Sequence, residues 1–196
     1  MRLIKPQYKS MTDESLMMSI SKGDKRAFDE VYARYSGPLL GYFIRMLWKD
    51  REKAEDFVHD IFAKIIRKPE SFDTTRNFKT WLYSVANNMC KNEYKKQEVR
   101  KNTSTGLDQH YSLSDDTSNV LYEVQDMQFR TEFEKSLDDL DLKHSEVFKL
   151  RHIECLSIKE IAEVLEISDG TVKSRLFYAT KYLAKSLKDF DPVENR

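Results

Sequence analysis

The sequence predicts an all-α protein made of two small helical domains. Charged residues make up 34% of its 196 residues, with only five Gly and four Pro, which is typical of a helix-rich globular chain. Apolar residues recur at helical spacing in several segments, whereas alternating strand patterns are scarce. Residues 98–119 are polar and lack sustained apolar spacing, so we interpret them as a flexible linker between domains at residues 1–97 and 120–196.

The N-terminal domain is expected to begin with three helices. Helical spacing predicts a short helix at Leu16–Lys22, a longer one at Lys25–Trp48 and a third at Arg51–Lys68, which Pro69 ends. Gly37-Pro38 leaves two readings open for the second segment, since the residue before a proline is biased away from the helical region. That segment is therefore either one kinked helix or two helices.

A polar, turn-like stretch at residues 70–77 separates the third helix from a fourth at Phe78–Lys96. Two further helices are expected at Val120–Asp138 and Ser145–Glu154. All of these assignments rest on the 3.6-residue period of buried positions.

The segment after residue 156 has the pattern of a helix-turn-helix. Ser157 followed by Glu160 fits a capping box, and the apolar residues that follow repeat with the spacing of one buried helical face. A three-residue break ends at Ser168, which is expected to cap a second helix. The inward stripe of that second helix is predicted to consist of Val172, Leu176, Ala179 and Leu183.

Charge is segregated along a chain whose net charge is zero. Thr171–Lys188 holds five cations and no acid, Arg76–Lys101 has a net charge of +5, and Asp108–Asp141 has a net charge of −8. A basic second helix suits a major groove lined by two rows of phosphates. The alternative is an amphipathic core helix with a solvated basic face. Because the two caps, the short turn and the acid-free helix occur together, we favour DNA contact.

The sequence argues against several other classes of protein. No apolar run is long enough to span a bilayer, and residues 1–10 lack a signal-peptide core, so we expect a cytoplasmic protein without membrane insertion. Cys90 and Cys155 are far apart and have no clustered His, which indicates neither a zinc site nor a disulfide. With no Gly-rich phosphate loop and four scattered His, we expect no enzyme, no metal and no cofactor.

Four segments, taken in order, resemble a bacterial RNA polymerase sigma factor of the extracytoplasmic-function type, in the sigma-70 family. They read AFDEVYARY from Ala27, AEDFVHDIFAKII from Ala54, FKTWLYSVANN from Phe78, and LDDLDLKHSEVFKLRHIECLSIKEIAEVLEISDGTVKSRL from Leu137. Many helix-turn-helix regulators would share the last segment. The second and third segments are far more specific.

The resemblance implies three sets of interface residues. Core RNA polymerase would be bound by Asp56, Phe57, His59, Asp60 and Phe62. The promoter element nearest the start site would be bound by Arg76, Phe78, Lys79, Trp81, Tyr83, Asn88, Lys91 and Lys95. The loop at residues 70–77 and Asn88 would hold an unstacked base of that element. The upstream element would be bound in the major groove by Thr171, Lys173, Ser174, Arg175, Phe177, Tyr178 and Lys181.

The partners implied are therefore core RNA polymerase, promoter DNA in duplex and single-stranded form, and an anti-sigma factor. Cys155 and Glu166 stand where glycine is frequent in the family, so the two turns have to be built without it. An alternative function is a one-component regulator that binds duplex DNA through the helix-turn-helix without polymerase. Its N-terminal half would then serve as a sensor or dimerisation module.

Overall fold

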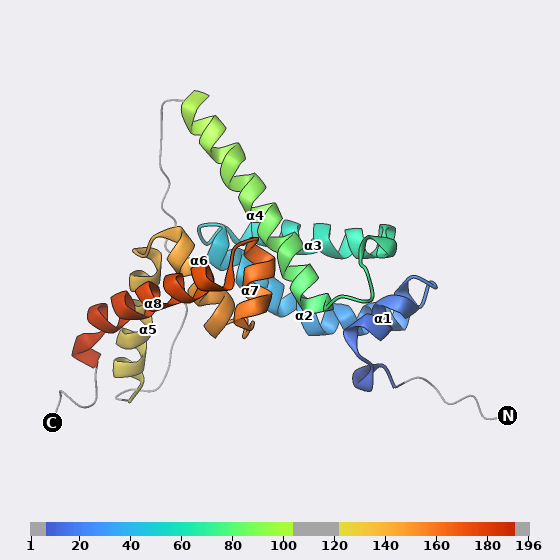
Figure 1. Ribbon diagram of the computed structural model, residues 1–196, viewed down its shortest axis with the longest axis horizontal. Coiled ribbons are helices and arrows are strands. Elements are labelled where there is room, and N and C mark those ends of the chain that lie inside the picture. Colours follow the sequence, from blue (N-terminus) through green and yellow to red (C-terminus); the bar gives the residue numbers. More distant parts are fainter. Residues whose placement is uncertain (1–6, 104–121, 191–196) are drawn as a thin grey trace. The chain divides into compact units, whose positions relative to one another are not determined.

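The computed structural model describes residues 7–103 and 122–190 (Figure 1). Within these ranges the chain forms eight α-helices and three short 3-10 turns and contains no strand, which confirms the predicted all-α class. The chain divides into two compact units, Met1–Tyr111 and Ser112–Arg196. Each unit buries its own apolar residues, so each is described by itself.

The first unit is built around the long helix α2. Leu39 and Phe43 of α2 are fully buried, as are Leu16 of α1, Ile65 of α3 and Leu82 of α4, so all four helices contribute to one core. The elements of this unit, in order, are η1 (Tyr8–Ser10), α1 (Asp13–Ile20), α2 (Lys25–Met46), α3 (Arg51–Arg67), η2 (Pro69–Ser71) and α4 (Phe78–Thr103).

Helix α2 is continuous through Pro38, which decides between the two readings of that segment. Gly37 and Pro38 are exposed, whereas Tyr35 and Leu39 on either side of them are buried. The backbone hydrogen bond that the proline removes therefore lies on the solvent side. The buried residues before and after it stay on one face, so the helix does not have to break.

Helix α1 is fastened to α2 by the Arg34 side chain. The guanidinium lies 2.7 Å from Asp13 Oδ1 and 2.8 Å from Glu30 Oε1, and it also donates to the backbone carbonyl of Met11 at 3.0 Å. The Tyr35 hydroxyl donates to the other oxygen of Asp13. Burial, followed by this hydrogen bond, raises the pKa of Tyr35, so the phenol stays neutral and keeps donating. The first turn of α1 is thus held from two sides.

Helix α4 runs from Phe78 to Thr103, so residues 98–103, which we predicted to be in the linker, are helical instead. Its last turns project beyond α2 and α3 in Figure 1. Tyr94 helps to anchor the middle of the helix, because its hydroxyl donates to the Met46 carbonyl and its ring packs edge-on against Trp48, with centroids 5.0 Å apart. The rest of the predicted linker, residues 104–119, lies outside the described residues.

In the second unit, α5, α6 and α8 together bury one group of apolar residues. Leu137, Leu140, Ala179 and Leu183 are buried together, and Phe133, Phe148 and Leu187 pack against them. The elements of this unit are α5 (Tyr122–Asp138), α6 (Leu142–His152), α7 (Ile158–Leu165), α8 (Asp169–Ser186) and η3 (Lys188–Phe190).

Candidate nucleic-acid and polymerase interfaces

The predicted helix-turn-helix is present as α7, a short turn and α8. The Ser157 hydroxyl accepts the Glu160 N–H at 3.3 Å, and the Glu160 carboxylate accepts the Ser157 N–H at 2.7 Å, so the predicted capping box is complete. The Ser168 hydroxyl accepts the Thr171 N–H at 3.1 Å and caps α8 as expected. These caps satisfy backbone donors that would otherwise be unpaired at the start of each helix.

The two turns that flank α7 use left-handed residues that are not glycine. Cys155 has φ of 56° and Glu166 has φ of 58°. After α7 the N–H of Ile167 donates to the Ala162 carbonyl at 3.0 Å, which closes the helix end. Before α7 the Arg151 guanidinium donates to the Leu156 carbonyl at 2.8 Å. Backbone and side-chain hydrogen bonds therefore hold both turns in a conformation that disfavours a side chain.

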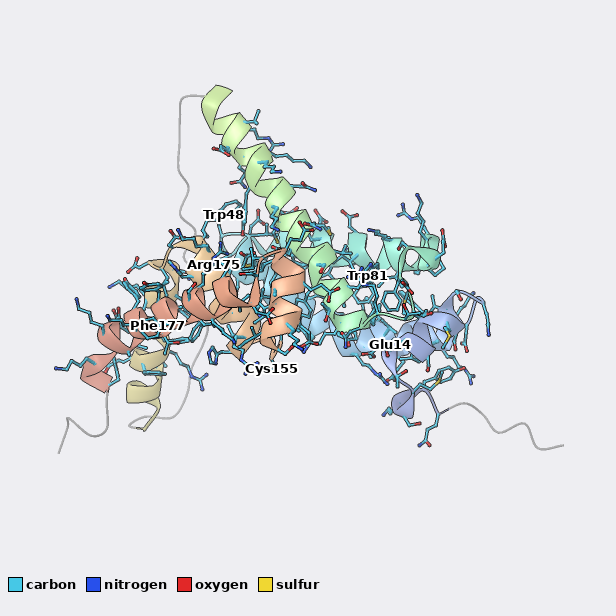
Figure 2. All side chains as sticks on the ribbon, in the orientation of Figure 1. Glu14, Trp48, Trp81, Cys155, Arg175 and Phe177 are labelled. Atoms are coloured by element: carbon cyan, nitrogen blue, oxygen red, sulfur yellow. The ribbon has the colours of Figure 1, made fainter. Side chains whose placement is uncertain are left out.

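Helix α8 places most of the predicted upstream-element residues in solvent. Val172, Ala179 and Leu183 of the predicted inward stripe are buried, and Leu176 is half-buried. On the opposite side the Phe177 and Tyr178 rings are 63% and 58% exposed. Figure 2 shows Arg175 and Phe177 on this helix. The remaining exposed residues predicted to contact DNA are Lys173, Ser174 and Lys181, whereas Thr171 and Arg175 are half-buried.

Exposed apolar rings among cations are what a DNA-reading helix needs. Cations neutralise phosphates, and apolar atoms contact the methyl group of thymine. Tyr178 also lies near His144 of α6, with ring centroids 6.0 Å apart, and Phe177 lies edge-on to Tyr178 at 5.6 Å. Because of these contacts the rings lose less freedom when a ligand orders them.

The predicted polymerase-binding residues of α3 divide into exposed and buried ones. Asp56, His59 and Asp60 are exposed along one side of the helix. Phe57 is half-buried with its ring edge-on to Phe43 at 5.3 Å. Phe62 is buried, so the expectation that its ring forms part of the surface is not met.

Phe62 instead supports an exposed ring on α2. Its ring lies 4.6 Å from that of Tyr32, which is 40% exposed. A shallow groove of about 300 Å³ between α2 and α3 is lined by Tyr32, Val58 and His59, among others. The exposed acids of α3 and this groove remain as candidate polymerase-binding surface, and Tyr32 provides the apolar surface that we had expected from Phe62.

The loop at residues 73–77 is a compact turn that leads into α4. Asp73 Oδ1 accepts both the N–H and the hydroxyl of Thr75, at 2.9 and 2.8 Å, and the Arg76 N–H donates to the Asp73 carbonyl at 3.0 Å. The bonds from Thr75 hold the pKa of Asp73 below its ordinary value. Asn77 Oδ1 accepts the Thr80 N–H at 2.8 Å and caps α4. The loop is thus ordered by its own polar side chains.

Only one of the three aromatic residues predicted to bind unpaired bases keeps surface available. Phe78 and Tyr83 are 0% and 1% exposed, so neither is free to stack on a base, contrary to our expectation. Phe78 lies edge-on to Tyr35 at 5.4 Å, and Tyr83 lies edge-on to Tyr42 at the same distance, because both point into the helix bundle. Trp81 is half-buried and remains the aromatic candidate.

Trp81 is held by residues that the sequence did not single out. Phe72 is buried with its ring 5.2 Å from the indole, and the Lys64 ammonium lies 6.0 Å from the indole centroid. The polar candidates around α4 retain surface. Arg76, Asn88 and Lys95 are exposed, and Lys79 and Lys91 are half-buried.

Glu14 is a further residue that the sequence analysis missed. Its carboxylate accepts the N–H of Phe78, the first residue of α4, at 3.0 Å across 64 positions of sequence. No local pattern could have indicated this, since a capping residue is sought next to its helix. Glu14 and Trp81 both lie near the start of α4 in Figure 2.

The described residues include no group of three or more His, Cys, Asp or Glu side chains placed to hold a metal ion. Over the same part of the chain, none of the helices is both long and apolar enough to cross a membrane.

Comparisons with known proteins identify the chain's relatives. Residues 31–100 match the family model of Sigma-70 region 2, and residues 130–183 match that of Sigma-70, region 4. The RNA polymerase sigma-H factor of Pseudomonas aeruginosa is 30% identical over 182 residues, which cover 90% of this chain and 94% of that protein. The ECF RNA polymerase sigma factor SigW of Bacillus subtilis is also 30% identical, over 87% of this chain and 94% of that protein.

Solved structures agree with this assignment. The sigma factor RpoE of Bartonella quintana, determined in complex with the anti-sigma factor NepR, is 25% identical with a TM-score of 0.69, over 82% of this chain and 96% of that one. CnrH, determined in complex with the cytosolic domain of CnrY, shares the fold with a TM-score of 0.64 at 24% identity, over 91% of this chain and 98% of that one. The chain therefore belongs to the sigma-70 family, as an RNA polymerase sigma factor of the extracytoplasmic-function group.

Proposed function

We propose that this sigma factor binds core RNA polymerase through its first unit and directs it to promoters that both units read. The observation that carries this proposal is the order of its parts. A unit matching sigma region 2 precedes a fully capped helix-turn-helix that matches region 4. A one-component regulator would use the first unit as a sensor or dimerisation module, which gives no reason for the exposed acids of α3 or the aromatic residues at the start of α4.

Core polymerase is proposed to dock on the α2–α3 face of the first unit. Asp56, Asp60 and His59 supply exposed polar groups, and Tyr32 supplies exposed apolar surface beside the groove. Exposed acids near an aromatic ring that loses water on binding suit a partner surface that is basic at its rim. Phe57 and Phe62 are proposed to support this face without contacting the polymerase, since their rings pack against Phe43 and Tyr32 of α2.

The start of α4 and its preceding loop are proposed to hold the single-stranded part of the promoter. Trp81 offers a partly open ring for base stacking, Asn88 offers an amide for a base edge, and Lys91 and Lys95 follow on the same helix for phosphates. The buried rings of Phe78 and Tyr83 set the position of this helix and do not touch the DNA.

Helix α8 is proposed to enter the major groove of the upstream element. Lys173, Lys181 and Ser174 are exposed for contacts with phosphates or guanine edges, and Phe177 is exposed for contact with a thymine methyl. The backbone N–H of Thr171 donates to the Ser168 hydroxyl, so any DNA contact of Thr171 would be made at the start of the helix. Arg175 is half-buried, and its contact is expected near the edge of the interface.

The protein is further proposed to act inside the cell, to carry out no covalent chemistry, and to be held in check by an anti-sigma factor. The structure of RpoE from Bartonella quintana was determined in complex with the anti-sigma factor NepR, and that of CnrH in complex with the cytosolic domain of CnrY. Such a partner would cover the α2–α3 face or α8, because these are the surfaces that the active protein needs free.

Run-off transcription tests the function. Purified core RNA polymerase is incubated with a pool of genomic promoter fragments, with and without this protein, and the RNA ends are sequenced. We expect discrete start sites that appear only when the protein is added. A chain that binds a duplex site tightly, but neither associates with the core enzyme nor changes its transcripts, would be a one-component regulator.

A further inference from the structure

The N-terminus of α4 is capped by two different residues. Asn77, the residue before the helix, accepts the Thr80 N–H at 2.8 Å through its side chain. Glu14, which belongs to α1, accepts the Phe78 N–H at 3.0 Å in a partly buried contact. The first N–H groups of a helix lack partners within the helix and carry partial positive charge. A carboxylate, which is ionised at neutral pH, therefore forms a stronger hydrogen bond with them than a neutral acceptor does.

The Glu14 backbone is itself fixed. Thr12 caps α1 with its hydroxyl at 3.3 Å from the Ser15 N–H. The neighbouring Asp13 is bound by both Arg34 and Tyr35 of α2. Because α1 is held on this side, the Glu14 carboxylate is a fixed acceptor whose position is set by α2. It therefore transmits the position of α2 to the first residue of α4.

The residue that Glu14 holds is the junction between the loop and the aromatic group. Phe78 follows directly on the loop at residues 73–77, and its ring contacts Phe72 at 5.2 Å and Trp81 at 5.7 Å between centroids. The backbone N–H of Trp81 in turn donates to the Asn77 carbonyl at 3.1 Å, in the first turn of the helix. A shift of Phe78 therefore moves both the end of the loop and the indole.

We propose that Glu14 is a positioning residue for promoter recognition: by accepting the Phe78 N–H it holds the loop at residues 73–77 and Trp81 in the arrangement that receives an unstacked base. This inference rests on the proposed function of the first unit. Glu14 lies outside residues 31–100, which match the region 2 model, so that match assigns it no role.

The test measures base selection and polymerase binding on the same holoenzyme. The probe is single-stranded DNA randomised over six positions, from which the wild-type holoenzyme selects its preferred base at each position. Discrimination is the ratio of affinities for the best and worst base at the most selective position. The variants are Glu14→Ala, which removes the acceptor, Glu14→Gln, which keeps an oxygen acceptor, and Met18→Ala, at an exposed position on the same helix.

We expect Glu14→Ala to lower discrimination about fivefold, the effect of losing one partly buried hydrogen bond that positions the site. Its affinity for core polymerase should stay within about twofold of wild type, and so should both measurements for Glu14→Gln and Met18→Ala. Unchanged discrimination in Glu14→Ala would overturn the inference. Equal loss of polymerase binding and of discrimination would also overturn it, because Glu14 would then merely stabilise the unit.

These outcomes differ from a failure of the proposed function itself. If the wild-type protein formed no holoenzyme, or its holoenzyme selected no base, the function proposed for the first unit would be wrong. If wild type selects a base and Glu14→Ala selects it equally well, only the role of Glu14 is wrong.

Discussion

The Lys53 ammonium of α3 lies 2.7 Å from Glu93 Oε1 of α4, and the Glu93 side chain is only 7% exposed. Lys53 therefore compensates a buried carboxylate. Replacing Lys53 with methionine keeps the apolar stem and removes the charge, so we expect the first unit to lose about 2 kcal/mol of unfolding free energy. The expected cost is below the roughly 3–5 kcal/mol for breaking a fully buried pair, because Lys53 itself is partly exposed.

Tryptophan fluorescence during urea unfolding measures this loss selectively, since both tryptophans of the chain, Trp48 and Trp81, lie in the first unit. The matched control is Arg51→Met. Arg51 pairs with Glu55 at 2.9 Å, but both side chains are largely exposed, so we expect a change of less than about 0.5 kcal/mol. Similar losses in the two variants would contradict the distinction between the pairs.

The same pair makes the stability of the first unit depend on pH. Burial alone would raise the pKa of Glu93, but the hydrogen bond and charge of Lys53 outweigh it and hold that pKa below its usual value. The stabilisation is therefore complete above the unfolded-state pKa, about 4.3, and is lost as the pH falls through the lower folded-state pKa. The stability advantage of wild type over Glu93→Gln should shrink as the pH falls below about 4.3.

That comparison is made by urea unfolding at a series of pH values between about 7 and 3. Repeating it in the Lys53→Met background provides the control, because the carboxylate then lacks the hydrogen-bonded cation that most favours its ionised form. A pH-independent difference between wild type and Glu93→Gln would show that ionisation of Glu93 does not stabilise the fold.

Glu166→Gly is expected to stabilise the second unit. Glu166 ends α7 with φ of 58°, a conformation that costs a side-chain-bearing residue about 1 kcal/mol relative to glycine. Glu163→Gly, three residues earlier in the same helix, should instead destabilise by about 1 kcal/mol. Opposite shifts of thermal midpoint, followed by circular dichroism, are the expected result. Two shifts in the same direction would mean that backbone strain at Glu166 is offset by its side-chain contacts.

Lys173→Gln should weaken binding to the upstream promoter element and reduce its salt dependence. Lys173 is exposed on α8, and loss of one phosphate contact lowers the slope of log K against log[salt] by about 0.9. The slope is measured by fluorescence anisotropy on the duplex element with the full chain. Lys143→Gln is the control, since Lys143 lies in the first turn of α6 and its ammonium is 3.4 Å from Asp141 Oδ2. An unchanged slope for Lys173→Gln would remove Lys173 from the phosphate contacts.

Asp56→Arg should weaken association with core polymerase at least about tenfold, because it reverses an exposed charge on the proposed docking face. Affinity of the full chain for duplex upstream DNA should not change. Glu98→Arg reverses another exposed charge, on α4 and not on α2 or α3, and is expected to leave polymerase association unaltered. Equal effects of the two substitutions would indicate a general electrostatic contribution and no specific docking.

Features set by neighbouring residues were predictable. The capping box of Ser157 and Glu160, the cap at Ser168 and the buried face of α8 each depend on residues within a few positions of one another. The helix bounds of α3 and α7 were likewise accurate. Residues 98–103 were misassigned because a polar composition resembles a linker, although polar residues also continue an exposed helix.

The candidate site was predicted less completely than the helices. Helical spacing marks Phe78, Trp81 and Tyr83 only as ring-bearing residues near the start of one helix. Two of these rings are buried because Tyr35 and Tyr42 of α2 lie opposite them. Phe62 was misjudged for the same reason, since Tyr32 covers it from another helix.

By itself, the sequence determined the helices, the helix-turn-helix and the sigma-factor resemblance, because periodicity, caps and motifs are relations between residues close together in the chain. Tertiary structure alone decided that Trp81 keeps surface for a base and that Glu14 holds the Phe78 N–H. Burial and capping from a distance depend on which helices pack together. Packing is a property of the whole unit, so no local pattern records it.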